Sequence, residues 1–215
     1  MSQPEILVLA RHCSTAGNEA GLVLGKADPT LSDRGHRQAK AIAEWFRSHF
    51  HELSIASSPS RRAVETAKFI GDAFQPSLAP TTDARLRERE MGEFDGLTAD
   101  AMIRRRHDLG HDVPLDATVI WNGVAGVERD DEIFSRAMEC IEALLVHRRV
   151  VGVVTHAGVI RALLHGVLGI DVMRPYAFHA RLGSAFVLVR NHGLWGLTEA
   201  WQNVESDFRF TSYRG

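Results

Sequence analysis

The 215-residue sequence contains only two cysteines, Cys13 and Cys140, and no long apolar run. Two cysteines in a chain of this size cannot form the disulfide framework of a small secreted domain, so a reducing compartment is the expected setting. No segment approaches the roughly 18 consecutive apolar residues of a membrane span. The N-terminal Met-Ser-Gln-Pro-Glu also lacks the basic and apolar regions of a secretory signal. We therefore expect a cytoplasmic protein without a membrane partner.

An excess of charge of one sign is also missing. The chain has 25 Lys and Arg against 27 Asp and Glu, a formal net charge of -2. No basic run is long enough for a nucleic-acid footprint, so no nucleic-acid partner is expected. Hydrophobic residues make up 45% of the chain, which is an ordinary globular composition. The length fits a single domain over 1–215, with a short lid-like insertion around 97–130 where the pattern is least regular.

Short apolar runs alternate with helical patterns along the chain. Strands are expected at Ile6–Ala10, Leu53–Ser57 and Val150–Thr155, with a terminal hairpin of Ala185–Val189 and Leu194–Trp201 around Asn191-His192-Gly193. Helices are expected at Gly35–Phe50 (capped by Ser32 or Asp33), Pro59–Ile70, Leu97–His107, Ile133–Leu145 and Gly158–Leu168, with a loop at His111–Val127. This alternation predicts a three-layer α/β/α sandwich, with a mostly parallel central sheet and helices on both faces.

Two histidines follow buried strands at equivalent positions. Arg11-His12 follows one strand in LVLARHCSTAGN, and His156 follows another in VVTHAGVIRALL. Ligands of such sheets bind beyond the carboxyl ends of the strands, so the two side chains converge if the strands are neighbours. A neutral imidazole is a competent nucleophile, and an adjacent guanidinium can hold a phosphate through paired hydrogen bonds. The start of the helix after His156 offers further N–H groups to an anion.

Two other segments carry candidates for phosphoryl-transfer chemistry. In IASSPSRRAVETA, Arg62 lies one turn into a helix, where it could hold a transferring phosphoryl group, whereas Arg61 fits a solvated surface charge. The departing oxygen needs a proton, which a carboxyl group with a raised pKa can supply. In LREREMGEFDGL our candidate is Glu88, and spacing alone leaves Glu90, Glu93 and Asp95 open.

His107 and His111 have the i, i+4 spacing of a metal-binding pair. Gly110 lies between them and no third ligand is obvious, so a solvated loop is the better interpretation and no metal is expected.

These segments, in this order, resemble the histidine phosphatase superfamily in its phosphoglycerate-mutase-like branch. The resemblance extends from Ile6 to about Val189, and GKADPTLSDRGHRQA matches a family stretch with one extra residue in its first gap. The other matching residues are Arg11, His12, Asn18, Ser57, Ser58, Pro59, Arg62, Ala63, Thr66, Ala67, Leu86, Glu88, Gly92, Phe94, Gly96, His156, Ala157 and Gly158.

The resemblance implies a phosphoglycerate mutase-like fold and a role for each matching polar residue. His12 would attack phosphorus and form a phosphohistidine. Glu88 would protonate the leaving group and then take a proton from the attacking water. Arg11, Arg62 and His156 would hold the phosphate oxygens and offset their charge.

The resemblance also implies the remaining parts of the site and its ligands. Asn18, Ala157 and the loop around Gly25 would line the pocket of a small phosphorylated substrate. No metal or other cofactor is needed, because cationic side chains do the electrostatic work. A homodimer is left open, since pairing through an edge strand leaves no mark in the sequence.

Two alternative functions remain beside a phosphatase. A phosphoglycerate mutase would return the phosphoryl group to substrate, but mutases of this family carry a longer insertion than the span from Glu88 to His156 allows. A short lid admits water and favours hydrolysis. A non-catalytic phospholigand-binding module would lack the nucleophile or the acid, and both are present.

The chain departs from the family pattern at three places. Cys13 replaces a usual Gly, and Ser14 replaces a common Glu or Gln. A cationic pocket beside Cys13 could lower the pKa of its thiol and make it sensitive to oxidation, although a buried and inert thiol is the commoner case. Glu128 matches a family Glu only weakly, and we assign it no role.

Overall fold

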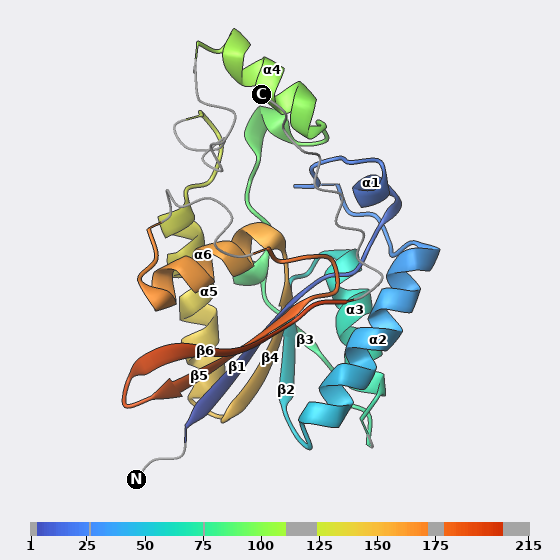
Figure 1. Ribbon diagram of the computed structural model, residues 1–215, viewed down its shortest axis with the longest axis vertical. Coiled ribbons are helices and arrows are strands. Elements are labelled where there is room, and N and C mark those ends of the chain that lie inside the picture. Colours follow the sequence, from blue (N-terminus) through green and yellow to red (C-terminus); the bar gives the residue numbers. More distant parts are fainter. Residues whose placement is uncertain (1–3, 26, 75, 111–123, 172–178, 204–215) are drawn as a thin grey trace.

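The computed structural model describes residues 4–25, 27–74, 76–110, 124–171 and 179–203. A six-stranded sheet in the order β3-β2-β4-β1-β5-β6 runs through the molecule (Figure 1). The strands are β1 (Glu5–Arg11), β2 (Ser54–Ser57), β3 (Thr81–Thr82), β4 (Val150–Thr155), β5 (Ala185–Asn191) and β6 (Leu194–Trp201). The helices are α1 (Ala16–Glu19), α2 (Asp33–His49), α3 (Arg61–Asp72), α4 (Ala99–Asp108), α5 (Asp130–Leu145) and α6 (Ala157–Leu168), with short 3-10 helices at Ala84–Leu86 (η1) and Gly92–Phe94 (η2).

The sheet is mixed, and its central strands are parallel. β1 pairs in parallel with β4, β4 with β2, and β2 with β3, whereas β5 and β6 add antiparallel pairs on the other side. In the β1–β4 register Arg11 lies opposite Thr155. The next residue of each strand is a histidine, so the register brings His12 and His156 to the same level beyond the sheet.

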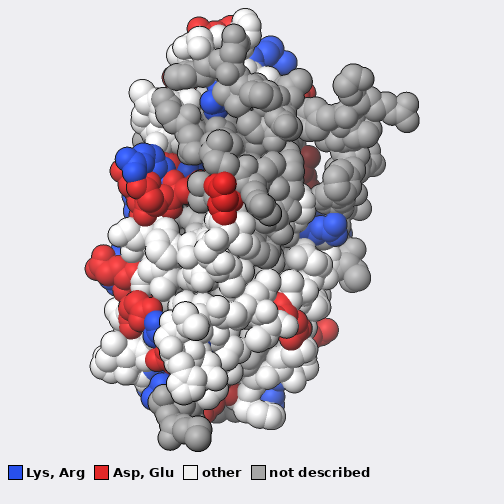
Figure 2. All heavy atoms as spheres, turned by 60° about the vertical axis from the view of Figure 1, so that its left-hand side comes forward, with Lys and Arg blue, Asp and Glu red and all other residues white. Residues whose placement is uncertain are grey.

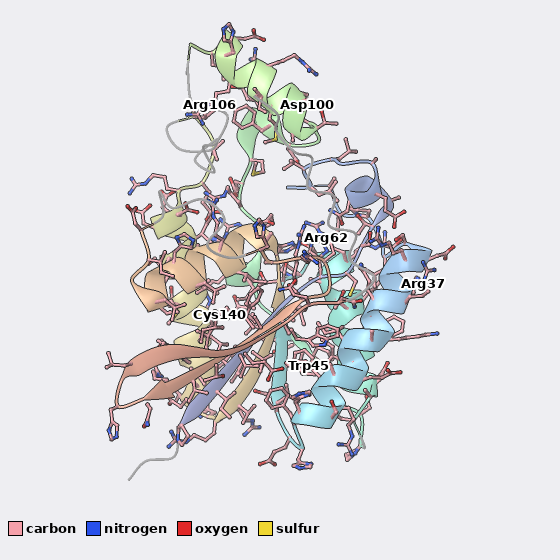
Figure 3. All side chains as sticks on the ribbon, in the orientation of Figure 1. Arg37, Trp45, Arg62, Asp100, Arg106 and Cys140 are labelled. Carbon is pink, nitrogen blue, oxygen red and sulfur yellow. The ribbon has the colours of Figure 1, made fainter. Side chains whose placement is uncertain are left out.

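Helices cover both faces of the sheet, as the alternation of strands and helices predicted. Because strand side chains alternate between faces, Leu7 and Leu9 pack into a core with α5 and α6, while Val8 and Ala10 pack into a second core with α2 and α3. Figure 3 shows one labelled side chain of each core, Cys140 on α5 and Trp45 on α2.

A third, smaller core lies apart from the sheet. Met91, Phe94, Met102 and Val124 form it, with α4 packed on top. Figure 1 shows α4 at the end of the molecule remote from the N-terminus, on the side toward which the carboxyl ends of β1 and β4 point. Two of its four residues, Met102 and Val124, fall within 97–130, the range of the predicted insertion. Residues 111–123 of that range, including most of the predicted loop and His111, lie outside the described part of the chain.

The three-layer α/β/α prediction is confirmed, with small shifts in element bounds. Ser32 caps α2 by accepting a hydrogen bond from the Gly35 N–H (3.1 Å). The helix expected from Pro59 begins instead at Arg61, because Ser60 is extended and the Arg61 N–H donates to the Asp28 carboxylate (2.6 Å). The hairpin closes on His192 and Gly193, both with positive φ, which suits a tight two-residue turn.

The face drawn in Figure 2 carries basic and acidic side chains of the described residues side by side in small mixed clusters. None of the helices in the described ranges has the length and apolar character that a bilayer span requires.

Candidate active site

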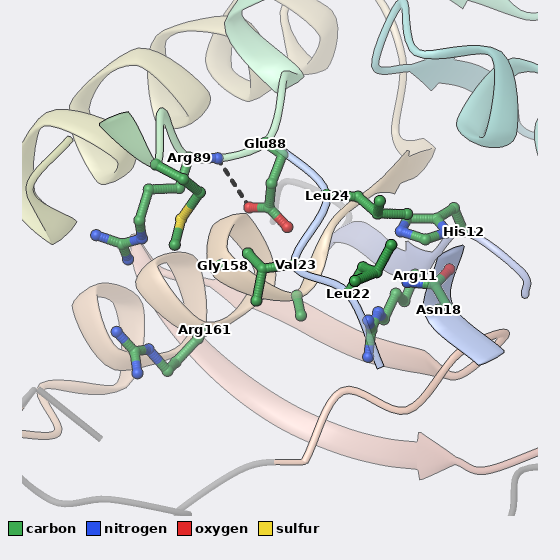
Figure 4. Close-up of a pocket in the computed structure, with 12 residues that line it drawn as sticks. Arg11, His12, Asn18, Leu22, Val23, Leu24, Glu88, Arg89, Gly158 and Arg161 are labelled. Carbon is green, nitrogen blue, oxygen red and sulfur yellow. Dashed lines mark hydrogen bonds between the residues drawn. The ribbon is translucent and has the colours of Figure 1, made fainter. Parts of the chain in front are cut away.

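A cavity of about 260 Å³ opens beyond the carboxyl ends of β1 and β4. Figure 4 shows its lining: His12, Arg11 and Asn18 on one side, Arg89 and Arg161 on the other, and Glu88 between them. The lining residues are Arg11, His12, Asn18, Leu22, Val23, Leu24, Glu88, Arg89, Met91, Ala157, Gly158 and Arg161. Five of the seven residues expected in the site therefore meet in one cavity, and the other two, Arg62 and His156, lie behind it.

His12 sits at the cavity with its tautomer fixed by a backbone contact. Its Nδ1 lies 2.8 Å from the Cys13 carbonyl oxygen, and a carbonyl can only accept, so Nδ1 carries the proton. Among the described residues this is the one hydrogen-bond partner of the His12 ring, and it leaves Nε2 unprotonated. Burial, followed by the charges of Arg11 and Arg62, lowers the pKa of His12 well below 6.5. The imidazole is therefore neutral, with a free lone pair on Nε2.

His156 lies next to His12, with ring centres 5.1 Å apart. A guanidinium NH2 of Arg62 donates to Nδ1 of His156 (3.3 Å), which leaves the proton on Nε2, and this donates to the Ser58 hydroxyl (2.8 Å). Burial lowers the pKa of His156 well below 6.5, and the adjacent His12 ring and the Arg62 guanidinium lower it further. The second histidine is thus also neutral, with the opposite tautomer.

Arg62 and Arg11 place two cations beside the histidines. Arg62 is 1% exposed and also donates to the carbonyl oxygens of Ala27 (2.8 Å) and Leu24 (3.1 Å), whereas Arg61 is exposed as expected. Arg11 donates to the Ala180 carbonyl (2.8 Å), and burial lowers its pKa to about 10. The buried Nε–H groups of both arginines have no acceptor among the described residues. Unpaired buried donors beside a cavity favour an anionic ligand.

The loop after β1 is held by side chains from α2 and α3, the two helices that cover one face of the sheet. The Cys13 N–H donates to the Thr66 hydroxyl of α3 (3.1 Å). The Ser14 N–H donates to the side-chain amide oxygen, Oε1, of Gln38 on α2 (2.9 Å). Cys13 is fully buried, and burial raises the pKa of its thiol to about 12. The hypothesis of an activated Cys13 thiol is therefore wrong, because the thiol faces the core instead of the cationic pocket.

Glu88 is the one cavity-lining residue among the four carboxylates considered. Its Oε1 accepts a hydrogen bond from the Arg89 N–H (2.8 Å). The same oxygen lies 2.5 Å from the point where a Cβ on Gly158 would be, so the carboxylate uses the space left by this glycine at the start of α6. Glu93 instead pairs with Arg105, and Asp95 accepts from the Gly25 N–H (2.6 Å).

Asn18 and Ala157 complete the set of expected residues. Asn18 lies in α1, where its side chain accepts hydrogen bonds from the backbone (3.2 Å) and hydroxyl (2.9 Å) of Thr15. Ala157 begins α6, whose N-cap residue His156 makes no side-chain capping bond. The first two residues of this helix, Ala157 and Gly158, line the cavity, and a helix N-terminus favours an anion.

Six lining residues were not named individually from the sequence: Leu22, Val23, Leu24, Arg89, Met91 and Arg161. The first three directly precede Gly25, in the loop that was expected to line the pocket. The loop is held against the small core by a hydrogen bond from the Val23 N–H to the Leu97 carbonyl (2.9 Å). The two arginines share Asp130, the first residue of α5. Only their charge marks them in the sequence, and charge alone does not distinguish them from surface arginines.

Comparison with known proteins shows the family of the chain. The family model of the histidine phosphatase superfamily (branch 1) matches residues 7–203. A glucosyl-3-phosphoglycerate phosphatase of Mycolicibacterium vanbaalenii is 34% identical over 178 residues, which are 77% of this chain and 75% of that protein. A metal-independent phosphoserine phosphatase of Arabidopsis thaliana is 31% identical over 73% of this chain and 66% of that protein.

A solved structure shows the same fold. A mycobacterial glucosyl-3-phosphoglycerate phosphatase in complex with VO3 superposes with a TM-score of 0.75 at 28% identity, covering 92% of this chain and 98% of that one. The family model matches the chain from β1 to beyond β6. This chain therefore belongs to the histidine phosphatase superfamily, branch 1.

Proposed function

We propose that the protein hydrolyses a small phosphate monoester through a phosphohistidine formed on His12, without a metal ion. The observation that carries this proposal is the state of His12: a neutral imidazole with its proton held on Nδ1 and a free Nε2 in the cavity. Arg11 and Arg62 beside it supply fixed positive charge, which is what a transferring phosphoryl group requires.

The proposed reaction has two steps at one phosphorus atom. Nε2 of His12 attacks phosphorus, the bond to the ester oxygen breaks, and Glu88 gives its proton to that oxygen. The positive charge that develops on the ring is stabilised by the hydrogen bond from Nδ1–H to the Cys13 carbonyl. Water then attacks phosphorus, Glu88 takes up a proton from it, and the P–N bond breaks to release phosphate.

The remaining expected residues would bind the phosphoryl group. Arg11, Arg62 and His156 would hold its oxygens, and Asn18 and Ala157 would line the pocket beside it. Arg62 and His156 lie behind the cavity lining, so we propose that they act from the interior side. The segment 97–130 would form a short cover over this pocket within a single domain.

The substrate class is proposed from the relatives. Phosphoserine and glucosyl-3-phosphoglycerate, which the names of two relatives give as substrates, are both phosphate monoesters of small hydroxy acids. We infer a small phosphorylated metabolite of this kind, met in the cytoplasm, and no nucleic-acid or membrane partner.

The test is phosphate release from p-nitrophenyl phosphate and a panel of small esters, including phosphoserine and phosphoglycerate. Wild type and His12→Ala are compared with and without chelator. Release that resists the chelator and is lost in His12→Ala supports the proposal. Release from no ester in the panel would overturn it and leave phospholigand binding, which the same panel measures by calorimetry.

A mutase is the second candidate, because one relative is named phosphoglycerate mutase-like protein 4 of Arabidopsis thaliana, with 32% identity over 73% of this chain and 68% of that protein. Incubation of the enzyme with 3-phosphoglycerate, followed by separation of the products, distinguishes the two. Inorganic phosphate as the main product supports the hydrolase, and an isomeric phosphoglycerate supports the mutase.

A further inference from the structure

The segment that carries Glu88 is bonded along its length to residues 127–130, which lead into the start of α5. The Glu128 N–H donates to the Glu90 carbonyl (2.9 Å), and Met91 forms a bridge with Val127. These backbone contacts join residues nearly 40 positions apart in the sequence. They place 88–91 and 127–130 side by side.

Side chains reinforce this pairing on both sides of Glu88. Arg87 lies 3.4 Å from the Glu128 carboxylate, and Arg89 pairs with Asp130 while donating to the Glu128 carbonyl (2.5 Å). Figure 4 shows the Glu88 carboxylate pointing into the cavity, while the guanidinium of Arg89 points away from His12. Glu88 thus faces the cavity, and the residues on either side of it are held by acidic partners from one short segment.

Arg136 of α5 extends the same arrangement to η1. Its Nε and NH2 donate to the two oxygens of Glu128 (2.6 and 2.8 Å), and its NH1 donates to the Arg85 carbonyl (2.5 Å). The side chains of Glu128 and Asp130 are each 10% exposed, and those of Arg89 and Arg136 are 3% and 12% exposed. Two-point ion pairs that are shielded from water fix geometry more strictly than surface pairs do.

The protonation state of the acidic partners agrees with this geometry. Burial raises the pKa of Glu128, but the hydrogen bonds and charge of Arg136 and Arg87 bring it below its ordinary value. The same balance between burial and the charges of Arg89 and Arg161 lowers the pKa of Asp130. Both groups therefore stay ionised, and the ion pairs persist, throughout the neutral range.

We propose that Glu128 and Asp130 are positioning residues, which hold the carboxyl group of Glu88 at the distance from the ester oxygen that proton transfer requires. This inference rests on the proposed function, in which Glu88 is the general acid. It also assigns a role to Glu128, whose sequence context showed none. Glu128 and Asp130 touch no reacting atom. Glu128 acts through Arg136 and the backbone of 85–90, and Asp130 acts through the side chains of Arg89 and Arg161.

The test uses the leaving group as the readout. Departure of p-nitrophenolate needs little help from an acid, whereas departure of an alkoxide needs a proton in the transition state. Wild type, Glu88→Gln, Glu128→Gln and Asp130→Asn are compared by kcat/KM on p-nitrophenyl phosphate and on glycerol phosphate. For Glu128→Gln and Asp130→Asn we expect a loss of roughly tenfold or more on glycerol phosphate, as for an acid displaced by a fraction of an ångström. The loss on p-nitrophenyl phosphate should be only about twofold.

Glu142→Gln is the matched control, since Glu142 also lies on α5 and pairs with an arginine, Arg190, away from the cavity. It should leave both rates near wild type. A variant that folds poorly lowers both rates together, and the ratio between the two esters does not change.

The outcomes separate this inference from the proposed function. A selective loss in both Glu88→Gln and Glu128→Gln supports the positioning role. A selective loss in Glu88→Gln, with equal or no losses in Glu128→Gln and Asp130→Asn, overturns the positioning role and leaves the acid in place. An unselective loss in Glu88→Gln overturns the acid role of Glu88, and the positioning role with it.

Discussion

The two imidazoles of the site are buried side by side, with ring centres 5.1 Å apart and exposures of 3% for His12 and 0% for His156. Two protonated rings at this distance, next to two arginines, would place uncompensated charge in the interior. Burial and the arginines therefore lower both pKa values well below 6.5. The electrostatic environment that would receive a phosphate thus also keeps the nucleophile unprotonated.

These lowered pKa values predict how stability depends on pH. The unfolded chain binds protons on both imidazoles below about pH 6.5, while the folded chain does so only at much lower pH. The unfolded state thus binds more protons in this window, and the free energy of unfolding should decrease as the pH falls from 7 toward 5. Urea unfolding at several pH values measures this decrease, and it should be smaller in His12→Ala. A free energy that stays constant between pH 7 and 5 in wild type would contradict the prediction.

A second prediction for a single residue concerns Gly158. A methyl group at this position would lie 2.5 Å from Oε1 of Glu88, and the end of that side chain would have to move. Gly158→Ala should therefore leave folding intact, since alanine favours the helix, but should lower kcat/KM by roughly tenfold through displacement of the carboxylate.

The control for this variant is Gly196→Ala, where a Cβ meets no atom within 4 Å. It should leave the steady-state kinetics at wild-type values. Wild-type kcat/KM in Gly158→Ala would show that the position of Glu88 in the cavity does not govern the rate.

The sequence indicated the residues whose position depends on a strand end, and it missed those whose position depends on packing. His12 and His156 could be paired because each directly follows a buried strand. The ionic contacts of Glu128 could not be foreseen, because its partner Arg136 becomes a neighbour of η1 only when α5 packs against it. The burial of Cys13, expected as the commoner case, depends on which way the loop turns after β1.

At the scale of elements, the loop after β1 is fixed by the two helices on its face. Thr66 of α3 accepts from the Cys13 N–H and donates to the Arg62 carbonyl (2.8 Å), so one hydroxyl joins the loop to the helix of Arg62. Gly35 of α2 approaches so closely that a Cβ there would lie 2.0 Å from the Ser14 carbonyl oxygen. The backbone next to His12 therefore has little freedom to move.

Thr66→Val tests this contact with almost no change in shape. The buried Cys13 N–H would lose its acceptor, which costs about 1–3 kcal/mol of unfolding free energy. Activity should also fall, since the loop next to His12 is released. Urea unfolding and kcat/KM measure the two effects, with Lys68→Ala on the exposed side of α3 as the control. Stability equal to that of the control would show that the hydroxyl does not hold the loop.

Most element types were correctly predicted from periodicity, whereas their ends depended on contacts distant in sequence. α2 was found with its cap narrowed to Ser32 or Asp33, because a capping residue lies beside the helix that it caps, and the structure selects Ser32. The start of α3 was misplaced, because Asp28, which receives the Arg61 N–H, comes from a loop about 30 residues earlier.

On the scale of the whole molecule, the described residues pack into two cores on the sheet and one small core beneath α4. The small core is linked to the cavity by the bridge between Leu22 and Thr98 and by the Gly96 N–H, which donates to the Val23 carbonyl (2.8 Å). Part of the cavity lining is therefore held by the core with the fewest buried residues among those described.

Met102→Ala should destabilise the small core beneath α4 without destabilising the two cores on the sheet. Met102 is 1% exposed, and removal of a buried side chain costs about 2–5 kcal/mol in a full core. We expect faster hydrogen exchange in α4 and around Leu22–Leu24, and a raised KM, with little change in exchange across β1 and β4. Ile141→Ala, in the core beside α5, should instead lower the main thermal transition. An exchange increase spread evenly over the chain in Met102→Ala would contradict an independent small core.

The hydrogen bond from Nδ1 of His12 to the Cys13 carbonyl also determines which isomer of the modified residue can form. Since Nδ1 is occupied by its proton, only Nε2 has a lone pair to accept the phosphoryl group. A trapped intermediate should therefore react with reagents specific for the Nε2-linked isomer and be silent to those specific for the Nδ1-linked one. Isomer-resolved mass spectrometry or antibodies could then report turnover on this single atom.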